Sequence, residues 1–294
     1  MKWGTKVTIY TFSVITSTGY PYYDLHIKNL PKGIKLYLRF FDFTEKSLKP
    51  NISLESGKSF ELNAGLISAL FEFARNMDKK IKNLEFKSRT DDPLENLTSK
   101  HRTYRGDVLI TTQTETYLLH KSIRQKVRLI YDAVISAKIP LDSSGDITNA
   151  EEKKIIEILT DKQARNRVQD NSGNIRMSSN TFLEEMKDYG LEGICITSFD
   201  LSPIMVLGEK YSFKDIEIIL RNIGAIPIID PLEWKYRQSF FKGSQVWVYL
   251  INSGIGVTVD GLFEPYFYLL FADPQSYLGE FPANLASEFN MILG

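Results

Sequence analysis

The residues best suited to covalent or metal chemistry are few in this sequence and far apart. The single cysteine, Cys195, lies within the apolar run Ile194–Ile196, where we expect a small buried thiol. The three histidines, His26, His101 and His120, all belong to the first half of the chain and match no local metal-ligand spacing. Because an activated thiol needs a nearby base, the sequence predicts neither a cysteine nucleophile nor a metal site.

Motifs that bind phosphate or form a nucleophile elbow are absent from the sequence as well. It contains no G-x-x-x-x-G-K-S/T loop and no G-x-S-x-G run. Gly254-Ile255-Gly256 lies between two strand-like runs with no helix after it, which is typical of a turn. The paired acids Glu151-Glu152 and Glu184-Glu185 lie early in predicted helices, where they complement the positive end of the helix dipole. We therefore predict no catalytic residue, no metal, no cofactor and a protein that is not an enzyme.

A basic stretch of one predicted helix is better suited to binding. Opposite the apolar stripe of this helix lie four cations, Lys121, Arg124, Lys126 and Arg128. Such a face is either simply solvated or contacts an anionic lipid surface or an acidic protein. Nucleic acid is not expected, because Lys+Arg and Asp+Glu are both 36 and the formal net charge is zero.

A group of aromatic residues in the second half is the other candidate binding surface. Trp234, Tyr236 and the doublet Phe240-Phe241 follow two prolines and fit no clean period. Aromatic side chains that cluster at a surface anchor protein interfaces. We therefore predict that these residues contact a partner or the other domain.

Length and charge divide the chain in two. Its 294 residues suggest two domains of about 150 residues each. Residues 1–174 hold 28 basic and 21 acidic residues, whereas residues 175–294 hold 8 and 15. The polar, turn-rich composition of residues 169–174 is typical of a linker. We therefore place one domain at 1–170 and another at 175–294. We expect the opposite net charges of the two domains to attract the domains to each other or to a partner.

The composition also bears on location. One cysteine excludes an internal disulfide framework and fits a reducing compartment. No window approaches the roughly 18 apolar residues of a membrane span, and residues 1–19 lack the uninterrupted apolar stretch of a signal peptide. We expect a cytoplasmic protein, with peripheral membrane contact left open.

Hydrophobic periodicity predicts helices and strands in both halves. The elements expected at 1–170 are strands Val7–Ile15, Tyr20–Ile27, Ile34–Phe43, Leu84–Arg89 and Asp107–Gln113, and helices Ser59–Lys79, Glu115–Ile139 and one that Thr148 caps with Glu151. Those expected at 175–294 are helices Ser179–Asp188, Ser212–Asn222 and Ala283–Ile292, and strands Ile194–Ser198, Pro203–Leu207, Val246–Ile251, Ile255–Val259 and Tyr266–Ala272. Each half is expected to be an antiparallel sheet with packed helices, an α+β fold.

Two segments of the second half resemble segments of a known domain family. Residues 191–204, with the turn Phe199-Asp200-Leu201 between two strands, resemble the opening of roadblock domains, where an Asp-Gly turn joins the first two strands. Residues 269–279 are similar to the last strand of that family and the start of its last helix. The sequence departs from the pattern at Leu201, where the family usually has glycine. The element order is also that of the family.

The first half is similar to longin domains, especially those of archaea that carry eukaryote-like small GTPases. The resemblance lies in the hairpin residues Thr18-Gly19-Tyr20-Pro21 and the apolar helix residues 65–73. Together the two resemblances imply two profilin-like domains, longin-like and then roadblock-like, each an antiparallel sheet with packed helices.

The resemblances imply a non-enzymatic scaffold or regulator that binds a small Ras-like GTPase or another longin or roadblock protein, with a homodimer left open. One alternative is a subunit of a membrane-trafficking or tethering assembly, whose basic helix contacts anionic membrane. Another is a small-molecule sensor or enzyme with a pocket beside the sheet. These are expectations from likeness of fold, which fixes function only by association.

Overall fold

The computed structural model describes residues 7–16, 20–43, 108–139, 141 and 147–294, together with seven residues between 65 and 76. The chain divides into two compact units, one of residues 1–44 with 105–294 and one of residues 45–104. The seven described residues of the predicted helix Ser59–Lys79 are helical. The predicted strand Leu84–Arg89 and the turn residues Thr18 and Gly19 lie outside the described residues. The first unit is the one that can be followed in detail.

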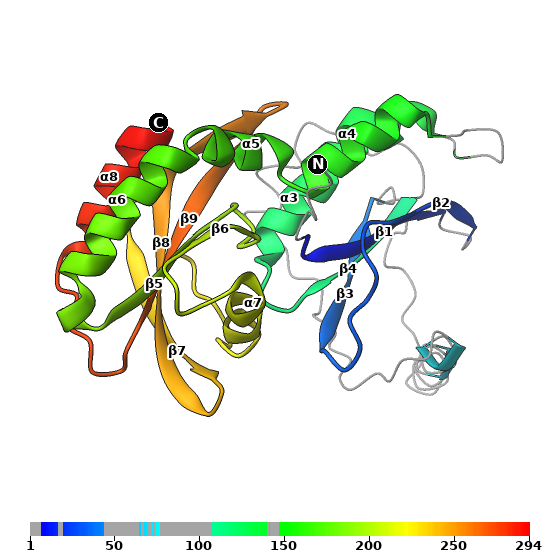
Figure 1. Cartoon of the computed structure of the whole chain (residues 1–294). Coiled ribbons are helices and arrows are strands. Elements are labelled where there is room, and N and C mark those ends of the chain that lie inside the picture. Colours follow the sequence, from blue (N-terminus) through cyan, green and yellow to red (C-terminus); the bar gives the residue numbers. More distant parts are fainter. Residues whose placement is uncertain are drawn as a thin grey trace, which may run out of the picture. The chain divides into compact units, whose positions relative to one another are not determined.

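Four strands of this unit form an antiparallel sheet, called the first sheet here. Their order across the sheet is β2-β1-β4-β3 (Figure 1). The strands are β1 Ile9–Thr16, β2 Pro21–His26, β3 Leu36–Asp42 and β4 Val108–Glu115. All four were predicted, because their residues have the β-branched and aromatic composition of strands.

The helical region after β4 differs from the prediction at its first part and agrees with it at α4. Instead of one helix over Glu115–Ile139, the chain forms α3 at His120–Ile130, a π-helical turn at Tyr131–Ile135 and a 3₁₀ turn at Ser136–Lys138. Helix α4, Asn149–Leu159, has the predicted capping box: the Glu151 N–H donates to Thr148 Oγ1 and the Thr148 N–H donates to Glu151 Oε2.

The polar residues predicted to be a linker are helical. Helix α5 spans Lys162–Asp170 and α6 spans Ser172–Glu185, so residues 169–174 comprise the end of one helix and the start of the next. The linker prediction is wrong because buried Ala164, Val168 and Ile175 tie both helices to the core, although polar side chains surround them. Glu184-Glu185 consequently lie in the last turn of α6, not in a first turn. The proposed domain boundary stays a prediction.

Five strands form the second sheet, which is also antiparallel, so the unit is α+β. Its order is β6-β5-β9-β8-β7. The elements of this region are a 3₁₀ turn Lys187–Tyr189, β5 Leu191–Thr197, β6 Pro203–Leu207, α7 Phe213–Arg221, β7 Trp234–Phe241, β8 Ser244–Val259, β9 Leu262–Ala272 and α8 Phe281–Leu293.

Two strand predictions in this sheet are corrected. Val246–Ile251 and Ile255–Val259 belong to one strand, β8, and the register shifts between Asn252 and Gly256. The glycine cluster is therefore a bulge inside a strand, not a turn, and a Cβ on Gly256 would lie 1.9 Å from the Glu264 carbonyl oxygen. Strand β7 was not predicted. Aromatic and polar side chains are mixed on the same half-exposed face of this strand, so its sequence lacks the clear alternation of apolar and polar residues that indicates a strand.

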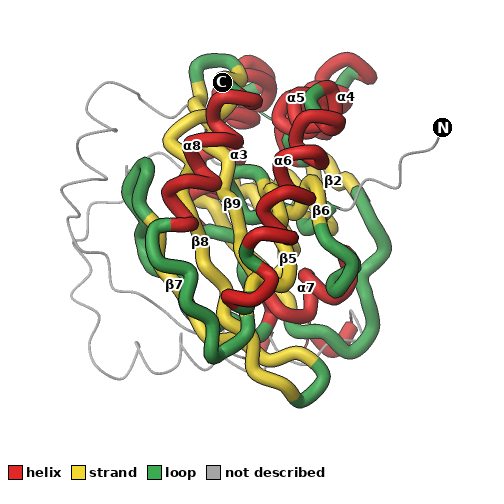
Figure 2. The backbone as a smooth tube through the Cα atoms, turned by 60° about the vertical axis from the view of Figure 1, so that its left-hand side comes forward, coloured by secondary structure: helices red, strands yellow, loops and turns green. Residues whose placement is uncertain are grey.

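Helices cover both faces of the second sheet. Figure 2 shows α6 and α8 side by side across one face, where their residues Phe182 and Phe281 make an edge-to-face ring contact. Helix α7 packs on the opposite face, where the Ser239 hydroxyl of β7 donates to the Ile219 carbonyl. Within the part of the chain that the structure describes, the outermost strands β6 and β7 pair with one neighbour each. These two edges and the helices beside them are where the candidate surfaces lie.

Candidate partner-binding site

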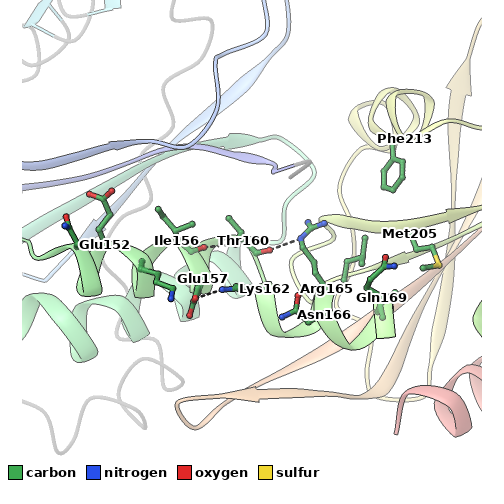
Figure 3. Close-up of a pocket in the computed structure, with 14 residues that line it drawn as sticks. Glu152, Ile156, Glu157, Thr160, Lys162, Arg165, Asn166, Gln169, Met205 and Phe213 are labelled. Atoms are coloured by element: carbon green, nitrogen blue, oxygen red, sulfur yellow. Dashed lines mark hydrogen bonds and ion pairs between the residues drawn. The ribbon is translucent and has the colours of Figure 1, made fainter. Parts of the chain in front are cut away.

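A groove of about 850 Å³ runs beside the β6 edge (Figure 3). It is built from α4, α5, β6 and the start of α7, so both halves of the chain contribute to it. Its lining combines apolar side chains with a larger number of polar and charged ones. They come from Asn149, Glu152, Lys153, Ile156, Glu157, Thr160, Lys162, Arg165, Asn166, Val168, Gln169, Ile204, Met205 and Phe213.

The polar groups of the groove hold its walls together. Lys162 Nζ lies 2.6 Å from Glu157 Oε1 across the α4–α5 junction, and Glu152 accepts a hydrogen bond from Tyr23 of β2. Arg165 donates to the Thr160 carbonyl at 2.7 Å, to the Pro203 carbonyl and to the Ser202 hydroxyl. Because its guanidinium nitrogens bond to these protein oxygens, Arg165 positions α5 against β6. A groove of this size can take a ligand but contains no convergent catalytic group among its described residues.

Only part of the predicted basic face lies at the surface. Lys121 and Arg124 are exposed on α3, and Arg128 is half-buried. Lys126 is completely buried, so its predicted place on the solvent face is wrong. The prediction failed because the helical stripe that faces the interior includes position 126, and the interior there contains carboxylates rather than apolar atoms. Of the four predicted cations, two are therefore exposed, one is half-buried and one is buried.

Lys126 is the cation of a buried charge cluster. Its Nζ lies 2.5 Å from Asp161 Oδ1, at the α4–α5 junction, and also pairs with Asp200 in the β5–β6 turn. Burial opposes the charged ammonium, but these two carboxylates raise the pKa of Lys126 above its usual value. Sequence reasoning missed this cluster, since no spacing along the chain connects residues 126, 161 and 200.

The β5–β6 turn that carries Asp200 is itself buried. Asp200 accepts hydrogen bonds from the Ser198 hydroxyl at 2.7 Å and the Ser202 N–H at 2.9 Å, while the Ser122 hydroxyl of α3 donates to the Phe199 carbonyl. Leu201 has φ of 71° and is fully buried. This is the position at which the roadblock pattern has glycine, and leucine adopts the left-handed conformation there at some cost in strain. Helix α3 thus docks directly on the turn.

A second buried ion pair connects the first sheet to α7. Arg221 donates to both carboxylate oxygens of Glu115 on β4, at 2.9 and 2.6 Å, and Tyr10 of β1 also bonds this carboxylate. Glu115 is almost completely buried. A bidentate arginine–carboxylate pair fixes orientation as well as distance. The two halves of the described unit are therefore joined by charge at two places.

The predicted aromatic residues lie on the edge strand β7. Tyr236 and Phe240 are 50% and 56% exposed, Trp234 is half-buried on the same strand face, and the Tyr236 ring stacks on Trp247 of β8 at 5.3 Å. Phe241 lies on the other face of β7, where it contacts the Tyr211 ring. The structure thus brings three of the four predicted aromatic residues onto one face.

The residues considered for covalent or metal chemistry lie apart. Cys195 is fully buried on β5, and burial raises the pKa of its thiol well above the usual value. His26 lies on β2 with its ring 2.9 Å from Asp24, and His120 begins α3; His101 lies outside the described residues. Within the described ranges no group of three or more His, Cys, Asp or Glu side chains is arranged to hold a metal ion.

Two further findings bear on identity. Within the part of the chain that can be described, no helix combines the length and apolar character needed to cross a membrane. No protein-family model matches the sequence, and a comparison with curated proteins finds no match.

Proposed function

We propose that this chain is a non-enzymatic binding protein that docks a small Ras-like GTPase or another longin- or roadblock-type protein. Its two halves would be profilin-like domains, as the sequence resemblances imply. In support, residues 172–293 follow the order helix, two strands, helix, three strands, helix, although the three strands are β7, β8 and β9 and not the three that the sequence predicted. The hairpin β5–β6 and the run from β9 to α8 are the segments that carry that resemblance.

The observation that carries the proposal is the aromatic face of β7, the edge strand of the described second sheet. Among the described residues β7 is the last strand of its sheet, and its backbone is partly engaged, since the Phe240 carbonyl accepts from the Asn222 side chain and the Tyr236 carbonyl from Arg237. Tyr236 and Phe240 add exposed aromatic area beside that edge. An edge strand with exposed aromatic side chains is suited to binding a macromolecule by side-chain burial, which needs no catalytic residue.

Binding to GTPases tests the proposal directly. Small Ras-like GTPases, each loaded with GDP or with a non-hydrolysable GTP analogue, are immobilised and the Kd of the purified protein is measured. We expect at least one GTPase to bind with an affinity that differs at least tenfold between nucleotides. The double variant Tyr236→Ser, Phe240→Ser should weaken this binding at least tenfold, since exposed aromatic anchors contribute about 2 kcal/mol or more.

The matched control is Tyr189→Ser, which removes a 54% exposed tyrosine from the 3₁₀ turn before β5. It should leave the Kd unchanged. Nucleotide-insensitive binding, or no binding across the panel, contradicts the GTPase as the partner. An equal loss in Tyr189→Ser would show that β7 is not the surface involved.

The groove beside β6 favours a second candidate function, a sensor of a small amphipathic molecule. Its volume lies within the range of small-ligand clefts, and Ile156, Ile204 and Phe213 provide apolar walls. A ligand from a small-molecule library should raise the Tm of the wild type, and Ile156→Trp should abolish that shift by filling the groove. The control Ile228→Trp changes an 86% exposed residue and should keep it. Equal shifts in both variants would eliminate this candidate.

A further inference from the structure

The main-chain ladder of β7 continues into the segment that precedes the strand. The Leu232 N–H donates to the Asn252 carbonyl of β8 at 2.9 Å, and the Asn252 N–H donates to the Glu233 carbonyl at 3.0 Å. Leu232 precedes Trp234 by two residues, the same spacing that separates Trp234 from Tyr236. The segment before β7 is therefore held next to the aromatic residues as an extension of the edge strand.

Asn252 fixes this segment with its side chain as well. Its Nδ2 donates to the Ile229 carbonyl at 2.9 Å, and its Oδ1 accepts from the Gly254 N–H at 3.2 Å. Asn252 and Ile229 are both buried. The segment from Ile229 to Glu233 is thus tied to Asn252 by three hydrogen bonds, which give the side chains that it carries defined positions.

Leu232 is the unusual residue of this segment. Its φ is 66°, in the left-handed region, where a leucine is strained and where glycine, asparagine and aspartate are preferred. The side chain is 67% exposed, so burial compensates for little of this strain. Leu201 also has a positive φ, but it is fully buried. Among the described residues, Leu232 alone combines a left-handed backbone with an exposed apolar side chain.

A leucine at this position is better explained by binding than by folding. Glycine would adopt the same backbone without strain, and a polar residue would be better solvated. Backbone strain that persists at an exposed position is a feature of functional sites, where the side chain serves something other than stability. An exposed leucine next to exposed aromatic residues enlarges one apolar surface, and such surfaces mark protein contacts.

The charges beside Leu232 indicate what kind of surface it meets. Glu233 and Lys235 lie on either side of Trp234 and are 3.8 Å apart, so this pair adds no net charge. A highly charged partner surface would gain nothing from such a pair, whereas an apolar pocket would gain from burying the leucine.

We propose that Leu232 is an anchor of the β7 docking surface and inserts into an apolar pocket of the small GTPase. This inference rests on the proposed function with a GTPase as the partner. It adds the chemistry of the contact: the GTPase buries Leu232 together with Tyr236 and Phe240, and the strain of the leucine backbone is the cost of presenting that side chain to the partner.

The test measures stability and binding together, because the two are expected to change in opposite directions. Leu232→Gly relieves the left-handed backbone, so the Tm should rise. It also removes the apolar side chain, so the Kd for the GTPase that binds the wild type should weaken at least tenfold. Leu232→Met keeps an apolar side chain of similar volume and should bind within about twofold of the wild type.

Asp260→Gly is the matched control. Asp260 also has a positive φ, 47°, but it lies in the β8–β9 turn, where its exposed ion pair with Lys154 contributes little. The Kd of this variant should equal that of the wild type. This result would show that glycine at a left-handed position does not by itself impair binding.

Each contrary outcome identifies what has failed. A lower Tm in Leu232→Gly overturns the proposal, because the leucine would then serve the fold. An unchanged Kd in Leu232→Gly overturns it too, and loss of binding in Tyr236→Ser, Phe240→Ser would then leave the proposed function standing. If no GTPase binds the wild type, the GTPase is not the partner and this inference falls with it. Phosphatidylcholine vesicles that bind the wild type but not Leu232→Gly, with an unchanged Kd for the GTPase, would assign the leucine to a membrane instead.

Discussion

At the scale of single residues, the most consequential side chain is one that the sequence misplaces. Lys126 lies in a basic run with Lys121 and Arg124, yet it is fully buried between Asp161 and Asp200. A buried ion pair adds little net stability compared with apolar packing, because desolvation offsets the attraction. Removing one partner is different, since it leaves the other charge buried and unpaired.

Lys126→Met should therefore lower the free energy of unfolding by about 3–5 kcal/mol, because two carboxylates lose their counter-ion. Lys121→Met is the matched control on the exposed face of the same helix and should change stability by less than about 0.5 kcal/mol. Urea denaturation at pH 7 measures both. Equal effects of the two substitutions would show that Lys126 is not held as described.

At the scale of elements, β8 is one long strand because a glycine permits a bulge within it. Gly256 packs so closely on β9 that its backbone approaches the Glu264 carbonyl. Gly173, in the first turn of α6, has no heavy atom within 4 Å of the position a Cβ would take. The same substitution should therefore have opposite effects at the two sites.

Gly256→Ala should destabilise the protein by about 2 kcal/mol or more, because the new methyl group overlaps the β9 backbone and the two strands must separate. Gly173→Ala should stabilise it by about 0.5–1 kcal/mol, since alanine loses less conformational entropy in a helix. Thermal unfolding of the two variants measures the difference. A neutral Gly256→Ala would mean that the bulge has no close contact with β9.

At the scale of the whole described unit, charge connects the first sheet to the second. Lys126 reaches the β5–β6 turn, and Glu115 of β4 binds Arg221 of α7. Separating the two halves would remove from the buried carboxylates of Asp200 and Glu115 the cations that pair with them, Lys126 and Arg221. Groups that lose their partners together contribute to one cooperative transition.

We therefore expect residues 7–43 and 108–294 to unfold in a single step. Hydrogen exchange under native conditions should give the amides of β1 and β9 the same free energy of opening, within about 0.5 kcal/mol. Denaturation followed by circular dichroism and by tryptophan fluorescence should give coincident transitions. Earlier exchange of β1 would show instead that the first sheet opens independently.

The sequence alone determined the parts of the fold that depend on local spacing. The strands of the first sheet follow from β-branched and aromatic composition, and the start of α4 follows from Thr148 and Glu151, whose capping bonds join residues three apart. The limits of α7 were similarly predictable, because Ser212 caps it. The mixed α+β class follows from the same patterns.

Only the tertiary structure decided which side chains are enclosed and which edges stay open. Whether Lys126 is solvated depends on Asp200, 74 residues away, and no local period encodes that contact. Trp234, Tyr236 and Phe240 were singled out from the sequence as a candidate surface, but their place on an edge strand of the described sheet depends on its strand order. Burial and pairing arise from contacts distant in sequence, and for that reason the candidate surfaces became defined only when the chain was folded.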